Sequence, residues 1–479
     1  MSYRTILNVF GRILLIEACL LLPAMVVAAL HGEPLEPFYL TMAALLVIGS
    51  ACLAVKKKKQ TIYAREGFII VALSWVGMSV MGALPFMLSG HIPSFIDALF
   101  ETISGFTTTG ASILTNVEAL PYGLLFWRSF THWVGGMGVL VFMLAVLPLA
   151  NVRSVHIMRA EVPGPTKGKL VPKMRSTAMI LYGIYIIMTV IEVILLVGGG
   201  MSLFDALLHS FGTAGTGGFG IKNTSVGYYN SAYFDVVIGI FMMLFGINFN
   251  LYYLLLLRNI KGIFRSEEFR LYIAIIVVCT AIITVDILSM FGTVAESLRY
   301  AFFQVSSITT TTGYSTTDFN LWPSLSKTIL AILMLIGACA GSTAGGLKVS
   351  RVLILCKSSL REIRRLLNPN SVSVVKLDRN TLDETTIHGS IIYFGMYMII
   401  LFISILLVSV DGFNFETSST AVFSCLGNIG PGLGDVGPAA SFAGFSVFSK
   451  LVLSLNMLLG RLEIYPILLL FSPATWRRK

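Results

Sequence analysis

Thr310-Thr311-Thr312-Gly313-Tyr314 is one of four glycine-centred strings that decide how this chain folds. Each lies between two long apolar runs, and the other three are Thr107-Thr108-Thr109-Gly110-Ala111, Gly215-Thr216-Gly217-Gly218-Phe219 and Gly427-Asn428-Ile429-Gly430-Pro431. With Gly110, Gly217, Gly313 and Gly430 taken as equivalent, the spacings are 107, 96 and 117 residues. One string alone would be read as a turn or a helix-packing glycine. Four at similar spacing predict a fourfold repeat of helix, re-entrant loop and helix, which one chain needs to surround a pore.

The composition is that of a polytopic membrane protein. The 479 residues have a mean hydropathy of +0.83 and only 12% are charged, whereas a soluble domain has about 25% charged residues. The six cysteines form no CxxC pair and the six histidines form no HExxH motif, so we expect neither zinc nor a disulfide framework. No set of catalytic side chains stands out, and we expect a protein that is not an enzyme and binds no cofactor.

Long apolar runs alternate with shorter ones. A helix needs about 20 apolar residues to cross a bilayer, and we expect ten such helices, at 8–30, 36–55, 67–89, 122–149, 177–199, 231–257, 270–291, 326–355, 387–410 and 446–471. Shorter segments at 95–107, 203–214, 295–309 and 415–427 each lead into one glycine string. At ~12–15 residues they cannot span ~30 Å of hydrocarbon. This is the pattern of a pore helix followed by a filter loop.

Positive charge predicts the orientation. With the N-terminus in the cytoplasm, 28 of the 34 lysines and arginines fall on cytoplasmic segments, chiefly 56–65, 153–175, 258–270 and 348–379. Lysine and arginine are enriched in cytoplasmic loops, so the location of the net charge of +10 explains it better than binding to nucleic acid. All four glycine strings then lie near the outer side, and both termini are cytoplasmic.

We therefore expect an all-α polytopic membrane protein with four non-identical helix–pore loop–helix repeats around one central pore, plus two N-terminal helices. The expected boundaries are 1–62 for the N-terminal addition, 63–152, 153–262 and 263–357 for repeats 1 to 3, and 358–479 for repeat 4. Repeats 1 and 2 also share an Asp-Ala-Leu motif, at Asp97 and Asp205. Six residues before the glycine, Ser104, Ser307 and Ser424 recur.

The strings suit a site for a dehydrated cation. Rings of backbone carbonyls can replace the hydration water of an ion, and glycine tolerates the unusual dihedrals that such a loop needs. The candidate ion-binding residues are Thr108, Thr109, Gly110, Thr216, Gly217, Gly218, Thr311, Thr312, Gly313, Asn428, Ile429 and Gly430.

The chain resembles the membrane subunits of the bacterial Trk potassium-uptake systems, in the superfamily that includes the Ktr subunits and plant HKT transporters. The resemblance covers essentially the whole chain, and its most specific pieces are Thr107 to Gly110, Thr310 to Tyr314, Gly427 to Gly432, Gly337 to Lys348 and Gly460-Arg461. In this superfamily glycine at all four filter positions accompanies potassium preference, and serine at the first accompanies sodium permeability. The resemblance thus implies uptake of potassium and rubidium.

The run at 326–355 contains ten small residues, Gly337 to Gly346. Each glycine weakens a helix by about 1 kcal/mol, so we expect an unwound segment. The resemblance implies an intramembrane gate formed by Gly341, Ser342, Thr343, Ala344, Gly345 and Gly346. A helix-packing seam is the alternative; a phosphate-binding loop is excluded because Leu347 separates Gly346 from Lys348.

Arg461 lies within the last apolar run, where a charge is costly and usually faces a cavity or partner. The resemblance implies that it points into the pore below the filter and opposes cation passage. The alternative is an arginine that reaches the inner interface. Arg128 and Lys450 are expected either to pair with acids such as Asp97 and Glu101 or to lie at the outer interface.

The resemblance also implies partners and location. It implies a homodimer in the bacterial inner membrane and a cytosolic, nucleotide-binding TrkA-type subunit, for which 348–379 is a candidate docking segment. This chain carries no dinucleotide fingerprint. Symport with protons is not visible in the sequence. The alternative function is a cation transporter with alternating access, for which inverted repeats and paired discontinuous helices are expected.

Overall fold

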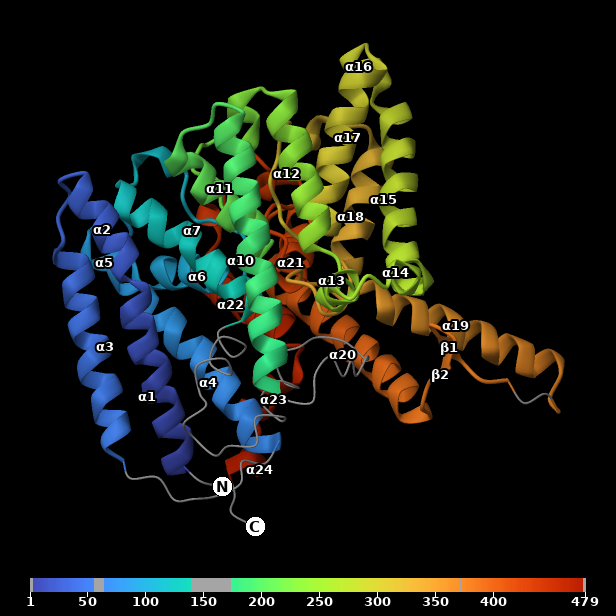
Figure 1. Ribbon diagram of the computed structural model, residues 1–479, viewed down its shortest axis with the longest axis horizontal. Coiled ribbons are helices and arrows are strands. Elements are labelled where there is room, and N and C mark those ends of the chain that lie inside the picture. The colour runs from blue at the N-terminus through green and yellow to red at the C-terminus, as the bar shows by residue number, and fades with distance from the viewer. Residues whose placement is uncertain (1–2, 56–63, 139–173, 371–372, 477–479) are drawn as a thin grey trace.

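The computed structural model describes residues 3–55, 64–138, 174–370 and 373–476 (Figure 1). Three features expected from the sequence lie outside these residues: the lysines at 56–59, most of the basic stretch 153–175, and the inner part of the run at 122–149. The described chain is helical apart from short turns and loops and one antiparallel hairpin of β1 (Lys376–Leu377) and β2 (Asn380–Thr381).

Two membrane helices precede the repeats. α1 (Tyr3–Leu20) continues into α2 (Leu22–Leu30), and α3 (Glu36–Ala54) packs beside α1 (Figure 1). A Cβ on Gly11 would lie 2.7 Å from the carbonyl oxygen of Gly49, so these glycines let the two backbones approach closely. The ring of Tyr3 stacks on Trp476 with centroids 6.3 Å apart, which places the two ends of the described chain on one side.

Four groups of helices follow, and each contains a long first helix, a short pore helix and a second helix. Group 1 contains α4 (Ala64–Gly82), α5 (Leu84–Leu88), α6 (Phe95–Phe106), η1 (Val117–Ala119) and α7 (Tyr122–Met137). Group 2 contains α10 (Met174–Gly198), α11 (Leu203–Gly215), η2 (Ser225–Tyr229), α12 (Ala232–Phe245) and α13 (Phe249–Leu256).

Group 3 contains α14 (Ile260–Arg265), α15 (Glu267–Asp286), α16 (Leu288–Phe291), α17 (Val294–Thr309), η3 (Phe319–Leu321), α18 (Ser324–Ile336) and α19 (Val349–Leu367). Group 4 contains α20 (Glu384–Val408), η4 (Ser409–Asp411), α21 (Phe415–Gly427), η5 (Gly434–Val436), η6 (Phe442–Gly444), α22 (Val447–Arg461), α23 (Tyr465–Phe471) and α24 (Pro473–Trp476). In Figure 1 the pore helices α6, α11 and α21 lie between the long helices α3, at the left, and α15, at the right.

The pore helices α6, α11, α17 and α21 begin in the same way. A side-chain oxygen of the preceding residue accepts a hydrogen bond from a backbone N–H in the first turn, and these residues are Ser94, Ser202, Thr293 and Asn414. Such caps satisfy N–H groups that have no partner within the helix. An acidic residue in each first turn complements the helix dipole. The opposite, carbonyl-rich ends run into the glycine strings.

The second helices differ from the expectation of single membrane spans. α12 and α13 are bent by 91° around residues 246–248. α22 ends at Arg461, and Glu463 and Ile464 are left-handed, with φ of 56° and 65°. α7 ends at Met137 before the left-handed Gly138. The sequence analysis predicted an unwound segment in the run at 326–355 and none of these other breaks.

Among the described residues, six helices are long and apolar enough to cross a membrane, and the bent pair α12–α13 can be a seventh. They include α3, α15 and α20, and their length and composition are those of a multi-pass membrane protein. Of the other expected runs, 326–355 and 446–471 are broken into shorter helices, and 122–149 is described only as far as Gly138.

Candidate ion pore

Four glycine loops follow the pore helices: loop 1 (107–111), loop 2 (215–219), loop 3 (310–314) and loop 4 (427–431). Each has a left-handed residue at its second position, with φ between 52° and 58°: Thr108, Thr216, Thr311 and Asn428. Two residues later each has a left-handed glycine, Gly110, Gly218, Gly313 or Gly430. The equivalent glycine in loop 2 is thus Gly218, and the sequence alignment that used Gly217 was one residue out of register.

Hydrogen bonds give the same register. The N–H groups of Thr109, Gly217, Thr312 and Ile429 donate, at 2.8 to 2.9 Å, to the carbonyls of Ser104, Gly212, Ser307 and Ser424. Gly212 is therefore the counterpart of the three serines found in the sequence. The sequence itself contained a signal for this register: aligning Asp97 with Asp205 in the shared Asp-Ala-Leu motif pairs Gly110 with Gly218.

The four loops form a closed ring. A Cβ on Gly110 would overlap the carbonyl oxygen of Gly217, one on Gly218 that of Thr312, and one on Gly313 that of Ile429. The ring closes where a Cβ on Gly430 would lie 2.8 Å from the carbonyl oxygen of Thr109. Each loop thus turns a carbonyl toward the glycine of the preceding loop, and only glycine fits there.

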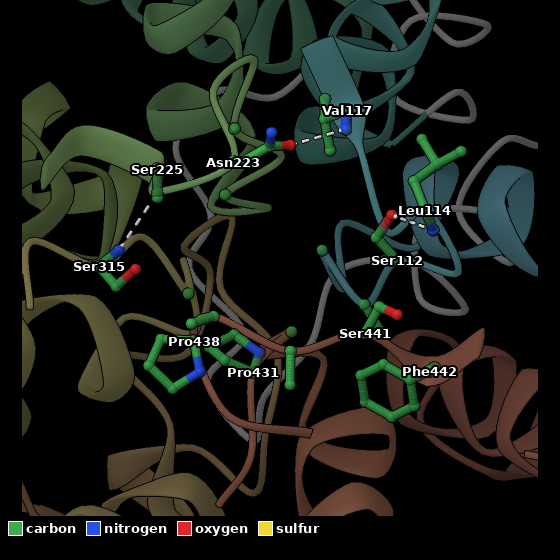
Figure 2. A pocket seen from close by; sticks show the side chains of 18 of the residues that line it. Ser112, Leu114, Val117, Asn223, Ser225, Ser315, Pro431, Pro438, Ser441 and Phe442 are labelled. Carbon is green, nitrogen blue, oxygen red and sulfur yellow. Dashed lines mark hydrogen bonds between the residues drawn. The ribbon is translucent and has the colours of Figure 1, made fainter. Parts of the chain in front are cut away.

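A cavity of about 350 Å³ lies over this ring, and its lining includes all four glycines, Gly110, Gly218, Gly313 and Gly430. Figure 2 shows Ser112, Ser225, Ser315 and Pro431, from all four groups, around it. Lys222 and Arg128 also line it. The glycine loops therefore share one vestibule.

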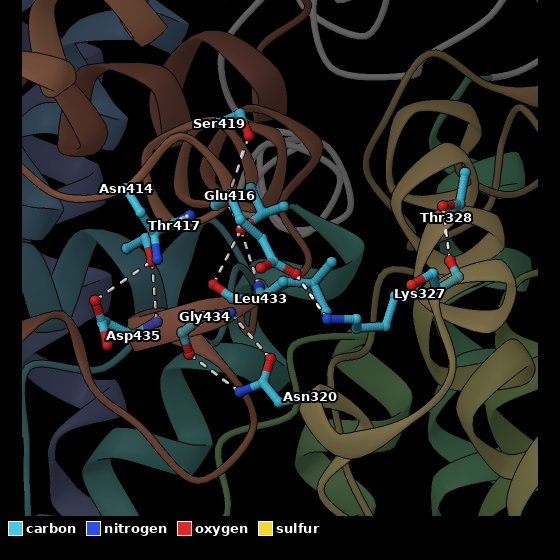
Figure 3. Close-up of polar contacts among 12 residues, drawn as sticks. Asn320, Lys327, Thr328, Asn414, Glu416, Thr417, Ser419, Leu433, Gly434 and Asp435 are labelled. Carbon is cyan, nitrogen blue, oxygen red and sulfur yellow. Dashed lines mark hydrogen bonds and ion pairs between the residues drawn. The ribbon is translucent and has the colours of Figure 1, made fainter.

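The segments after the loops are joined in pairs. The N–H of Val117 donates to Asn223 Oδ1 at 2.8 Å, and that of Ser315 donates to Ser225 Oγ at 3.3 Å (Figure 2). Asn320 and Gly434 exchange two hydrogen bonds of 3.0 and 2.9 Å (Figure 3), and the N–H of Phe442 donates to the carbonyl of Ser112 at 2.8 Å. These contacts close a second ring, above the first.

Ion pairs connect the pore helices with the second helices. Arg128 and Glu101 are buried and 2.6 Å apart, and Glu101 also accepts from Ser112 Oγ and the N–H of Ile113. Lys450 contacts Asp97 at 2.7 Å, and Lys327 contacts Glu416 at 3.2 Å (Figure 3). The pairing alternative for Arg128 and Lys450 is therefore confirmed. Glu101 therefore holds Ser112 and Ile113, the segment directly after loop 1, in place.

An inner loop, residues 337–348, separates α18 from α19 and lies against the glycine loops. The N–H of Gly345 donates to Thr311 Oγ1 at 2.8 Å. On its other side, the inner loop exchanges backbone hydrogen bonds of 3.1 and 3.0 Å with the bend between α12 and α13, through Cys339 and Gly341. The expected unwound segment is confirmed. Lys348, expected in the cytoplasmic basic stretch, is instead buried, with its Nζ on the carbonyl of Ala344.

Arg461 contacts this inner loop. Its guanidinium donates to the carbonyl of Thr343 at 2.7 Å and to that of Gly136 at 2.9 Å, and it also contacts the carbonyl of Gly135. One side chain of group 4 thus connects the inner loop of group 3 with the end of α7. The interface alternative for Arg461 does not fit these contacts.

Two acidic residues that the sequence analysis did not single out as contacts of this region also hold it. Glu268 is buried at the start of α15 and accepts the N–H groups of Ala340 at 2.6 Å and Ser350 at 3.1 Å, one toward each end of the inner loop. Glu463 pairs with Arg351 at 2.7 Å. Glu268 lies 72 residues from Ala340, and no local motif reveals such a contact.

A sequence model of the TrkH family, described as "Cation transport protein", matches residues 36–478. This chain belongs to the TrkH family. The Trk system potassium uptake proteins TrkH of Salmonella typhimurium and Escherichia coli are both 37% identical to it over 100% of each chain. The potassium uptake protein TrkG of Escherichia coli is 34% identical over 99% of both chains.

The fold agrees with the TrkH family. The crystal structure of the potassium transporter TrkH from Vibrio parahaemolyticus matches this one with a TM-score of 0.90 and 32% identity, over 100% of each chain. These relatives are named as transport proteins, in agreement with the expectation that the chain is not an enzyme. Family membership and the apolar helices make this TrkH-family chain a multi-pass membrane protein.

Proposed function

We propose that this chain takes up potassium, and rubidium, across the bacterial inner membrane through a channel-like pore. The observation that carries the proposal is the closed ring in which carbonyls of Thr109, Gly217, Thr312 and Ile429 each face the glycine of the neighbouring loop. Such a ring offers oxygens in place of hydration water. Close relatives named as potassium uptake proteins support the same ion.

The proposed filter consists of Thr108 to Gly110, Thr216 to Gly218, Thr311 to Gly313 and Asn428 to Gly430. The carbonyl ends of the pore helices lead into these loops, and their partial negative charge favours a cation. A membrane potential would drive inward flow with about 2.3 kcal/mol per charge per 100 mV. The repeat boundaries given above belong to this proposal.

The proposed gate is the segment Gly341 to Gly346 together with Arg461. Two observations support it: the N–H of Gly345 contacts Thr311 of loop 3, and Arg461 bonds to Thr343. A positive charge beside the ion path opposes a cation. Movement of the loop with Arg461 would open the path.

The chain offers a route from the cytoplasmic surface to this gate. Asp378, in the β1–β2 hairpin, accepts the N–H of Glu267 at 2.7 Å, and the next residue, Glu268, holds the inner loop. The basic helix α19 continues from the loop and contains Arg361, Arg364 and Arg365. We propose that a TrkA-type nucleotide-binding subunit docks on this face, and that both termini are cytoplasmic. A homodimer is part of the same proposal.

Alternating access is the rival. The bends in α12–α13 and α22–α23 give it some support, since discontinuous helices are typical of secondary transporters. The four groups, however, contribute equivalent loops to one ring, with matching left-handed residues. This arrangement favours a pore with one continuous axis.

Rubidium uptake into proteoliposomes of the purified chain tests the proposal, with potassium, sodium and ammonium as competitors. We expect potassium to block uptake far better than sodium. Equal competition by sodium would contradict the proposed preference for potassium. Absence of uptake, with and without the cytosolic subunit, would contradict the pore itself.

A further inference from the structure

Behind the four filter loops, the structural support differs from loop to loop. In loops 1 and 3 two threonine hydroxyls pair at 2.8 Å, Thr107 with Thr109 and Thr310 with Thr312. In loop 4 the corresponding residues are Gly427 and Ile429, and the isoleucine folds over the glycine, with its Cδ1 2.9 Å from where a Cβ would be. Each of these three loops is braced by its own side chains.

Loop 2 has no side chain at either position. Its corresponding residues are Gly215 and Gly217, and the space beside both is filled by His132 of α7. A Cβ on Gly217 would lie 2.5 Å from His132 Cγ and Nδ1, and one on Gly215 would overlap the His132 carbonyl. A residue of group 1 thus takes the place of the missing threonine pair in group 2.

The imidazole of His132 is held by a hydrogen bond and by a stacked ring. Nδ1 donates to the carbonyl of Gly105 at 2.7 Å, at the end of pore helix α6. The ring stacks on Phe219, just after loop 2, with centroids 4.1 Å apart, and it is fully buried. The guanidinium carbon of Arg128 in turn lies over the Phe219 ring, 3.6 Å from its centroid. The ring therefore sets the spacing between the end of α6 and loop 2.

We propose that His132 is a positioning residue of the filter, which holds the Gly217 carbonyl in the ring. This inference rests on the proposed function. The Gly217 carbonyl lies against Gly110, and without the imidazole a flexible glycine would hold it alone. A carbonyl that can move inward would coordinate smaller cations better. His132 then contributes to the preference for potassium over sodium without contacting the ion.

Gly217 provides the test, because its φ is negative, unlike those of Thr216 and Gly218. Alanine at 217 is therefore opposed by the His132 ring rather than by the backbone. We expect Gly217→Ala to reduce rubidium uptake about tenfold, as overpacking does. The double variant G217A/H132A should recover most of that loss. His132→Ala alone should lower the potassium-over-sodium competition ratio.

His209 offers a matched control, since it is also a fully buried histidine of the same region, in pore helix α11, but its Nε2 contacts the Tyr229 hydroxyl at 3.2 Å. G217A/H209A should show no recovery. Thermal unfolding midpoints should show the same pattern: a decrease in G217A, recovery in G217A/H132A and no recovery in G217A/H209A. The midpoints therefore test the packing even if the wild-type protein shows no selective uptake. Absence of selective uptake by the wild type would contradict the proposed function alone. If the alanine variant does not fold, His132→Phe takes its place: it keeps a ring there but loses the hydrogen bond to Gly105, so it should also lower the competition ratio, though less than alanine does. A fully active G217A, an unrecovered double variant, or an unchanged competition ratio in both His132 variants would overturn the inference.

Discussion

In the ring of glycine loops, close contacts between individual atoms decide which residue types fit at each position. Where a Cβ of Gly110, Gly218 or Gly313 would be, a carbonyl oxygen of the next loop already lies. These positions have φ between 69° and 83°, a region that disfavours other residues. Beneath the ring, the single side chain of Arg461 in group 4 contacts two other groups, at Thr343 and Gly136.

Removal of Arg461 should increase flux. Arg461→Ala deletes hydrogen bonds from a charged group, worth about 1.5–3 kcal/mol each, and a positive charge beside the ion path. We expect roughly tenfold faster rubidium uptake in proteoliposomes, while Arg461→Lys, which keeps the charge, should stay closer to the wild type. Unchanged uptake in the alanine variant would show that this charge is not a barrier.

The buried Arg128–Glu101 pair should matter for stability. Breaking a buried pair leaves an uncompensated charge and costs about 3–5 kcal/mol, so Arg128→Met should lower the thermal unfolding midpoint in detergent strongly. Lys327→Met breaks the pair with Glu416, in which the lysine side chain is 26% exposed. For such an exposed pair we expect a loss of less than about 1 kcal/mol of stability. Equal shifts in both variants would contradict this ranking. The sequence offered Arg128 acids such as Glu101 as partners but could not say that this pair is buried, because burial depends on the packing of distant segments.

At the scale of elements, the breaks in the second helices put irregular backbone beneath the ring of glycine loops, where we propose the gate. α12, α18 and α22 end and bend or unwind instead of crossing straight. The sequence predicted the break at 337–348 because many small residues gather there. It did not predict the break at Glu463 and Ile464: a left-handed, β-branched Ile464 has no local cause, and the distant pair of Glu463 with Arg351 lies beside it.

Deletion of Gly341 to Gly345 tests the gate as an element. We expect higher rubidium uptake, since the shortened chain cannot reach Thr311, with which Gly345 now bonds. The folded state can be checked by a monodisperse elution profile. A folded deletion variant with unaltered or abolished uptake would favour the helix-packing interpretation of this segment.

We expect Glu268 to stabilise the closed form of the proposed gate through its hydrogen bonds to Ala340 and Ser350. Glu268→Ala removes two hydrogen bonds to a charged acceptor, so the inner loop should open more often, and uptake should rise by roughly tenfold. The matched control is Glu267→Ala, whose carboxylate pairs with the partly exposed Lys357 and should have little effect. A rise of equal size in both variants would point to a general loosening of α15.

For the whole molecule, two stacked rings of contacts join the four groups: carbonyl against glycine in the filter, and paired loop segments in the vestibule (Figure 2). The repeat plan, the short pore helices and the two N-terminal helices could be predicted, because they depend on periodic apolar length. The order of contact around the ring could not, because it depends on which groups lie side by side. His132 illustrates this limit, since it supports a loop of the next group.

The central claim is that four loops form one potassium-selective filter. The most direct measurement replaces Gly110, Gly218, Gly313 and Gly430 by serine, one at a time, and compares rubidium uptake in the presence of potassium or sodium. We expect every one of the four variants to lose uptake or the preference for potassium, because each serine meets a carbonyl of the ring. A variant that retains both wild-type uptake and wild-type selectivity would show that its loop is not part of the filter, and would contradict the account.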